Sequence, residues 1–173
     1  MEYISTRNIH KNFSFKDVFL KGLAPDGGLF VPKEIPKYNN LKLQELKNLN
    51  YSQLTSKIII DFCGNEFSEN EVIDLVNSSY KNFREKNVVS IKKLKNINLL
   101  ELFHGPTLAF KDIAMQVIGN MYDKILKQND LKINVVVATS GDTGAAAIEA
   151  IKDKYCGSNF RGYRGRSSEC YKG

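Results

Sequence analysis

The sequence predicts an α/β protein, in which a mostly helical amino-terminal domain is followed by the first part of an α/β domain. In residues 1–90, apolar side chains recur at helical spacing behind capping residues. The unbroken β-branched run "INVVVAT" (133–139) is typical of a parallel strand that is covered on both faces. A glycine-rich turn and an alanine-rich segment follow it directly, which is the strand–turn–helix order of an α/β domain.

The first predicted elements lie close to the amino terminus. "YIST" (3–6) predicts a short strand. Ser14 then predicts the start of a helix, because Asp17 stands three residues later as a partial capping box, and Gly22 predicts its end.

The rest of the amino-terminal domain alternates between turns and helices. The prolines and glycines of "LAPDGGLFVPKEIP" (23–36) predict a turn followed by extended chain. One helix is predicted over 52–64. Another is predicted from Ser68, where Glu71 completes the S-x-x-E capping box.

The pattern changes after residue 90. "INLLELF" (97–103) predicts a strand with too little polarity for an exposed edge, and a helix is predicted over 111–127. The strand 133–139 and the helix after "SGDTG" complete this part. We expect residues 91–155 to be the incomplete beginning of an α/β domain.

Residues 156–173 show neither a helical nor a strand period and are rich in glycine, serine and arginine. The next strand of the α/β domain is due here, and we expect this segment not to form it. Foreign sequence, from a truncation, a frame shift or an assembly error, is the favoured interpretation of this tail. The alternative is a disordered RNA-contacting tail, because arginine alternates with aromatic residues in "NFRGYRGR".

Composition limits the functions that the chain can have. No apolar run approaches the ~20 residues that cross a bilayer, and "MEYISTRNIH" lacks the apolar core of a secretory signal. The three cysteines, Cys63, Cys156 and Cys170, are too scattered for a disulfide framework or a zinc site, so we expect a cytoplasmic protein without a metal.

The net charge of +6 is divided equally along the chain. Residues 156–173 contain four basic side chains and one acidic one, so they hold +3, and residues 1–155 hold the other +3. Such a mild excess does not require a nucleic-acid partner, and we expect none, nor a membrane partner. The sequence indicates no oligomeric state.

The stretch "HGPTLAFKD" (104–112) places Lys111 where a strand gives way to a helix. Ligands of open α/β sheets bind beyond the carboxyl ends of strands. The positive end of the helix dipole, together with partial burial beside Leu108 and Phe110, disfavours the ammonium form of this lysine. A neutral lysine forms Schiff bases with aldehydes; the alternative is a lysine whose stem packs while its head reaches water.

The stretch "TSGDTGAAA" (139–147) predicts a helix that starts at a Ser/Gly/Thr turn after a strand. Its free backbone N–H groups and the hydroxyls of Ser140 and Thr143 predict an anion site; alternatively, Asp142 only caps the helix. The stretch lacks the G-K-[ST] of a P-loop, and Ser140 lacks the Gly-x context of a nucleophile elbow.

The sequence contains only one other histidine besides His104, namely His10. A metal site or a proton relay requires more partners than this. We expect His104 to make a structural hydrogen bond near the loop that carries Lys111 (residues 104–112), here called the lysine loop.

Together these stretches resemble the threonine synthases, a family of fold-type II pyridoxal-phosphate enzymes. "HGPTLAFKD" resembles the family's cofactor-lysine signature, and "SGDTG" (140–144) resembles its substrate loop; relatives with other substrates usually carry Asn in place of Asp142. Independently, "FKDVFLKGLAPDGGLFVPKEIP" (15–36) resembles the family's amino-terminal domain. The resemblance covers residues 1–155 and implies a tryptophan synthase β-like catalytic domain that begins near residue 91.

The resemblance implies an enzyme that converts O-phospho-L-homoserine and water to L-threonine and phosphate, the last step of threonine biosynthesis. It implies that Lys111 forms a Schiff base with pyridoxal 5'-phosphate and acts as general acid and base, and that Asp142 also meets the cofactor. The implied substrate-binding residues are Ser140, Gly141, Asp142, Thr143 and Gly144.

The family's later half has no counterpart in this sequence, including the glycine-rich loop for the cofactor phosphate. We therefore expect the chain, as given, to be poorly stable and inactive alone. One alternative is a dehydratase acting on serine or threonine, which the amino-terminal domain disfavours. Another is a threonine-synthase-like binding protein without turnover.

Overall fold

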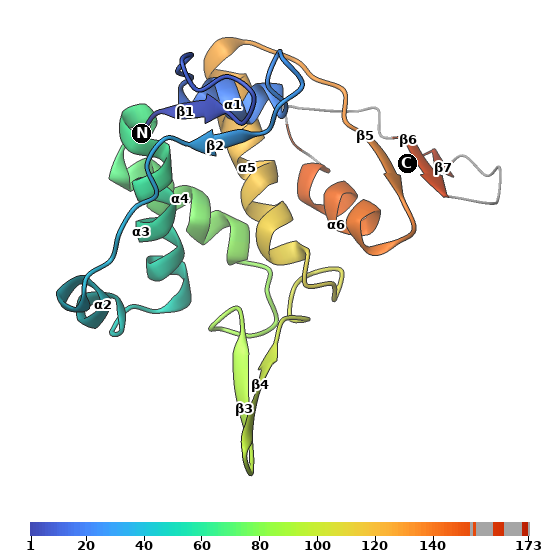
Figure 1. Ribbon diagram of the computed structural model, residues 1–173. Coiled ribbons are helices and arrows are strands. Elements are labelled where there is room, and N and C mark those ends of the chain that lie inside the picture. Colours follow the sequence, from blue (N-terminus) through green and yellow to red (C-terminus); the bar gives the residue numbers. More distant parts are fainter. Residues whose placement is uncertain (153, 155–160, 165–170, 173) are drawn as a thin grey trace. The chain divides into compact units, whose positions relative to one another are not determined.

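The computed structural model describes residues 1–152, 154, 161–164 and 171–172. The chain divides into two compact units, Met1–Asp74 and Leu75–Gly173 (Figure 1). The predicted domain boundary near residue 90 lies inside the second unit and stays a prediction.

The first unit opens with a two-stranded sheet and a capped helix. β1 (Tyr3–Ser5) pairs antiparallel with β2 (Phe30–Pro32). α1 (Phe15–Lys21) starts with a reciprocal capping box, in which the Asp17 N–H donates to Ser14 Oγ at 3.1 Å and the Ser14 N–H donates to Asp17 Oδ2 at 3.4 Å. The predicted first strand and first helix are therefore confirmed.

Helices make up the rest of the first unit. They are α2 (Asn40–Leu46), α3 (Tyr51–Cys63), the 3₁₀ turn η1 (Gly64–Glu66) and α4 (Glu69–Tyr80), which ends in the second unit. The predicted capping box of α4 is present, since the Ser68 N–H donates to Glu71 Oε2 at 2.9 Å and the Glu71 N–H to Ser68 Oγ at 3.3 Å. The sequence reading missed α2, whose cap is the Asn39 side chain.

Aromatic rings fill the core of the first unit. The Phe15 ring lies 6.2 Å from the Tyr3 ring and 6.2 Å from the Phe67 ring, centroid to centroid. The Tyr3 hydroxyl donates to the Phe62 carbonyl at 2.8 Å. Burial, with a smaller contribution from Glu66, raises the pKa of the Cys63 thiol to about 12.

In the second unit a β-hairpin follows α4 and extends away from the unit's helices (Figure 1). β3 (Ser90–Leu94) pairs antiparallel with β4 (Ile97–Glu101). The predicted strand exists, but the prediction that it is not exposed is wrong: Ile97 is 63% exposed and Leu100 52%. Low polarity in a strand predicts burial, whereas no described segment covers the hairpin.

The α/β part of the second unit follows the predicted order: α5 (Asp112–Asn129), β5 (Val136–Thr139) and α6 (Asp142–Ile151). β5 is shorter than predicted. It is also not covered on both faces within the described part of the chain, because Val136 is 73% exposed. The β-branched run therefore predicted the strand correctly and its burial wrongly.

Two further strands lie in the tail. β6 (Arg161–Arg164) pairs parallel with β5, and β7 (Tyr171–Lys172) pairs antiparallel with β6. The prediction that 156–173 forms no strand is wrong for these residues, because ladder hydrogen bonds join backbone groups and do not require a side-chain period. The rest of the tail lies outside the described residues, and its foreign origin stays a prediction.

α5 and α6 pack against each other without space for an added side chain at their contact. A Cβ atom on Gly119 of α5 would lie 2.4 Å from the backbone oxygen of Ala150 in α6. Both residues are buried. Gly119 therefore sets the distance between the two helices.

We predict that Gly119→Ala destabilises the chain. Helix propensity alone would favour alanine by about 1 kcal/mol, but the clash with the Ala150 carbonyl should reverse the sign, to a loss of about 1–3 kcal/mol. Urea denaturation followed by circular dichroism measures the difference. Ala114→Ser, at an exposed position of the same helix, is the control and should change little. A stabilised Gly119→Ala variant would contradict the packing described.

We predict that Cys63 resists thiol reagents at pH 8 until the chain unfolds, because its side chain is buried and its thiolate is disfavoured. The raised pKa also adds stability that is fully present below the unfolded thiol pKa near 9.0 and is lost as the pH rises toward about 12. Titration with a chromogenic disulfide, with Cys156 and Cys170 replaced by serine, tests this. Rapid reaction in native buffer would contradict it.

Candidate active site

Lys111 occupies the last position before α5. Its backbone is already helical, with φ −64° and ψ −22°, and its side chain makes no capping hydrogen bond. The predicted lysine at a helix start is therefore confirmed. Its side chain is half-buried.

The lysine loop is closed by hydrogen bonds between Thr107 and Asp112. The Thr107 N–H donates to Asp112 Oδ2 at 2.8 Å, and the Thr107 hydroxyl donates to Asp112 Oδ1 at 2.7 Å. Asp112 is fully buried. A Cβ atom on Gly105 would lie 2.4 Å from Asp112 Cβ, so only glycine leaves space for this carboxylate. The sequence reading missed both partners.

The amine of Lys111 lies beside an aromatic face. Its Nζ atom is 4.5 Å from the centroid of the Phe110 ring, within the range of a cation–π contact. Within the described residues, Lys111 forms no ion pair with a carboxylate. The expected partial burial of Lys111 is confirmed, because the residue is half-buried and its amine lies on the Phe110 ring. Leu108 and Phe110 are themselves 50% and 56% exposed, with no described segment over them.

The loop "SGDTG" joins β5 to α6. The Thr139 hydroxyl oxygen accepts from the Gly141 N–H at 3.2 Å and from the Gly144 N–H at 3.3 Å. Asp142 is the first residue of α6, is exposed, and forms no capping hydrogen bond. The interpretation of Asp142 as a helix cap is therefore wrong, and Thr139, which the sequence reading missed, holds the turn.

Two backbone donors stay available at this turn. In the described part of the chain, the N–H groups of Asp142 and Thr143 have no acceptor. They point along the axis of α6 at its positive end, which is the arrangement that binds anions. Ser140 is exposed, Thr143 is half-buried, and Gly144 is buried against Thr139.

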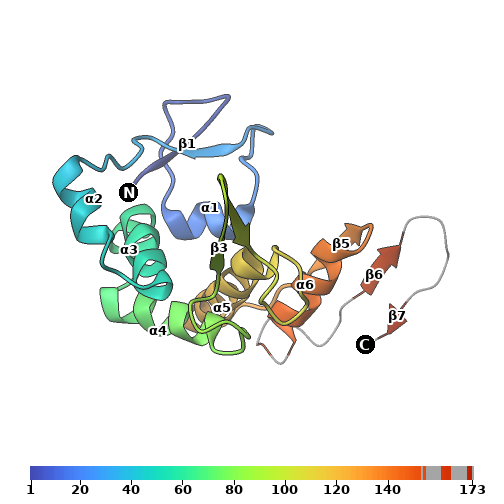
Figure 2. The same ribbon diagram turned by 90° about the horizontal axis from the view of Figure 1, so that it is seen from below.

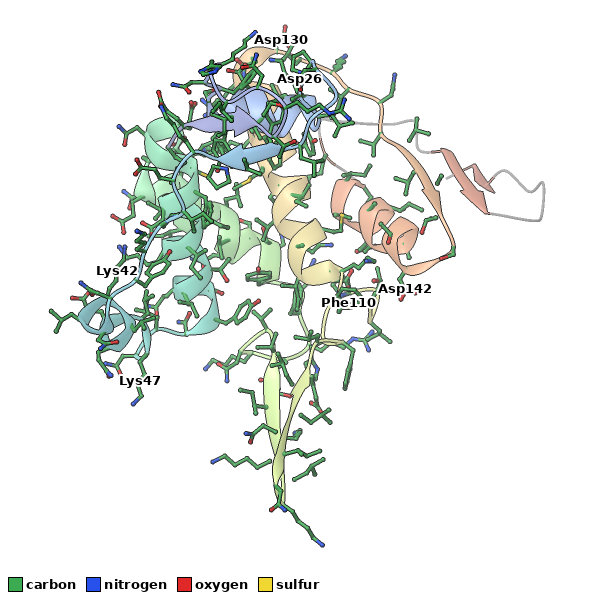
Figure 3. All side chains as sticks on the ribbon, in the orientation of Figure 1. Asp26, Lys42, Lys47, Phe110, Asp130 and Asp142 are labelled. Atoms are coloured by element: carbon green, nitrogen blue, oxygen red, sulfur yellow. The ribbon has the colours of Figure 1, made fainter. Side chains whose placement is uncertain are left out.

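The lysine loop and the "SGDTG" loop lie at the same end of a helix pair. α5 and α6 lie side by side and run in the same direction, as the two views show (Figures 1 and 2). Phe110 and Asp142, which flank the two helix starts, both lie at that end (Figure 3). The structure therefore brings together the two stretches that the sequence singled out.

His104 is part of a polar group at the base of the hairpin. Its Nε2 atom lies 3.2 Å from Ser90 Oγ and 3.3 Å from Glu101 Oε2. The hydrogen bond from the Ser90 hydroxyl lowers the pKa of the Glu101 carboxyl, and nearby Lys92 and His104 add to this. The prediction of a structural hydrogen bond for His104 is confirmed.

Among the described residues, no group of three or more His, Cys, Asp or Glu side chains is placed to hold a metal ion. None of their helices has the length and apolar content of a membrane span.

Comparison with known proteins gives the relationship directly. Residues 2–80 match the family "Threonine synthase N terminus". The chain is 42% identical over 164 residues to the threonine synthase of Schizosaccharomyces pombe, a match that covers 89% of this chain and 32% of that protein. Its structure matches the PLP-bound threonine synthase of Brucella melitensis with a TM-score of 0.85 and 39% identity. Over this length the chain is similar to the amino-terminal part of threonine synthases.

The match covers nearly all of this chain but only part of each related protein. The match with the Brucella structure includes 94% of this chain but only 34% of the Brucella chain. The chain thus spans about a third of the length of the threonine synthases that it matches. The human protein "Threonine synthase-like 2" is 38% identical over 154 residues, with 32% of its length covered.

We predict that Gly144→Ala disrupts the "SGDTG" turn and that Thr139→Ser relieves the disruption. A Cβ atom on Gly144 would lie 2.3 Å from Thr139 Cγ2, and serine lacks that methyl group while it keeps the hydroxyl that accepts both N–H groups. Gly144→Ala should lower the free energy of unfolding by about 1–3 kcal/mol, and Thr139→Ser/Gly144→Ala should recover most of it. Denaturation of the four forms gives the coupling energy. Additive losses would contradict the contact.

Proposed function

We propose that this chain is the amino-terminal part of a threonine synthase, which converts O-phospho-L-homoserine and water to L-threonine and phosphate with pyridoxal 5'-phosphate. One observation carries the proposal. In a chain that matches threonine synthases, the start of α5, which Lys111 directly precedes, and the open end of α6 lie together at one end of the helix pair.

The residues at this end have the chemistry that the cofactor requires. Lys111 offers a primary amine that is not engaged by a carboxylate in the described part of the chain, beside the aromatic face of Phe110. Lys111 would hold the cofactor through its aldehyde, with Asp142 as a second contact. When bound, the cofactor ring withdraws electrons from the substrate carbons, which acidifies their protons.

The chain's own residues would transfer the protons and bind the substrate. Lys111 Nζ, once released by the substrate amine, would take the proton from Cα and then one from Cβ, after which phosphate leaves from Cγ. It would return one proton to Cγ and, once the hydroxyl of water has added at Cβ, the other to Cα, while the remaining proton of the water goes to the released phosphate. The free N–H groups of Asp142 and Thr143, with the hydroxyl of Ser140, bind the anionic part of the substrate. The backbone of Gly141, beside which the chain leaves open space, lets the substrate approach the turn closely, and the backbone of Gly144 would complete the substrate's contacts there.

The chain as given should bind the cofactor without turning over substrate. It spans a third of the related enzymes, and apolar side chains next to Lys111 are open in the described part of the chain. An active site open to water lacks the low-dielectric surroundings on which proton abstraction from carbon depends.

We predict that pyridoxal phosphate followed by borohydride labels Lys111 in preference to other lysines. Peptide mass spectrometry measures the labelled fraction of Lys111 against the exposed Lys92 and Lys93, and Lys111→Arg should lose the preferred site while those two labels persist. Phosphate release from O-phospho-L-homoserine should stay at background. Equal labelling of all three lysines would contradict the cofactor assignment, and steady phosphate release would contradict the expected inactivity.

A binding protein without turnover is the second candidate, and the similarity to "Threonine synthase-like 2" favours it as much as a synthase. It predicts that O-phospho-L-homoserine binds the chain equally well with and without the cofactor. Isothermal titration of wild type and Lys111→Arg distinguishes the two, because a synthase site requires the cofactor held by Lys111 for tight substrate binding.

A further inference from the structure

We propose that Thr107 and Asp112 act as positioning residues, whose hydrogen bonds hold the lysine loop so that Lys111 is presented to the cofactor. This inference rests on the proposed function. It assigns neither residue a contact with the substrate or the cofactor.

The Asp112 carboxylate makes its hydrogen bonds within the lysine loop. It is fully buried, and both of its oxygen atoms accept hydrogen bonds from one residue, Thr107. Burial of a carboxylate is unfavourable unless such bonds replace its water, and within the described residues Asp112 has no cationic partner. The two bonds close a ring around the residues between them, of which Lys111 is the last.

These bonds do not cap α5. In α1 and α3, the side chain before the helix accepts from the N–H three residues later. Asp112 instead stands inside the helix and accepts from Thr107, which precedes it by five residues. A capping role would satisfy helix N–H groups, whereas this pattern fixes the loop.

The loop requires such a restraint. Leu108 has φ +64°, in the left-handed region that a residue with a branched side chain rarely adopts. Its side chain is 50% exposed, so packing contributes little to holding it there. Without the bonds between Thr107 and Asp112, Leu108 should relax toward ordinary backbone angles, and the direction of the Lys111 side chain would change with it.

The test uses the 173-residue chain and counts label at Lys111 relative to Lys93 after treatment with pyridoxal phosphate and borohydride. Thr107→Val removes one hydrogen bond to a charged group at nearly constant volume, and we expect about a tenfold lower ratio. Thr107→Ser keeps the hydroxyl and should restore the ratio. Thr55→Val, the same change within α3, is the matched control and should leave it unchanged.

Circular dichroism and the urea midpoint separate loop positioning from unfolding. If Thr107→Val does not fold, Asp112→Asn serves in its place. Its amide keeps one acceptor oxygen, so we expect the ratio of label at Lys111 to label at Lys93 to fall, but by less than about tenfold. A folded Thr107→Val or Asp112→Asn with a wild-type ratio would overturn the inference and leave the proposed function standing. No preference for Lys111 in the wild type would overturn both.

Discussion

The close approach of α5 and α6 is the constraint on which the candidate site depends. At Gly119 the two helices meet backbone to backbone, with no space for a methyl group beside the Ala150 carbonyl. Because the helices run in the same direction, their amino-terminal ends are also adjacent (Figure 2). Two positive dipole ends side by side repel each other, and an anion bound there is stabilised by both.

Both loops at this end are closed in a similar way. Thr107 bonds the Asp112 side chain and Thr139 accepts from the Gly144 N–H, each over a span of five residues into the start of a helix. In each case glycine is required where a Cβ would meet the partner, at Gly105 and at Gly144. The rigidity of the site thus comes from short loops tied to the helices that follow them.

Local interactions are the part of this structure that the sequence predicts well. The capping boxes that start α1 and α4 form between residues three apart, so the residue types alone reveal them. Burial is different, because it depends on segments distant in sequence. The apolar composition of β4 and the β-branched run of β5 predicted covered strands, and the described structure leaves both largely open.

In the candidate site, too, local motifs could be predicted from the sequence, whereas contacts that depend on the fold could not. The motifs around Lys111 and at 140–144 predicted two loops that the structure places at one end of the helix pair, because their residue types and positions after strands are visible in the sequence. The supporting threonines were missed, since a threonine in a loop has many possible partners and only the fold shows which one it takes. A threonine five residues before the helix-start Asp or Gly is the signal that was available.

The hairpin of β3 and β4 has consequences for how the chain behaves in solution. Paired residues share a face, so Ile91 with Leu100 makes one side apolar, and Leu94 with Ile97 does so on the other. A ribbon with two such faces and free backbone groups along its edges is a template for a third strand from another molecule. Lys92 and Lys93 are the charges that oppose this pairing. Salt that screens them should therefore favour self-association of the chain.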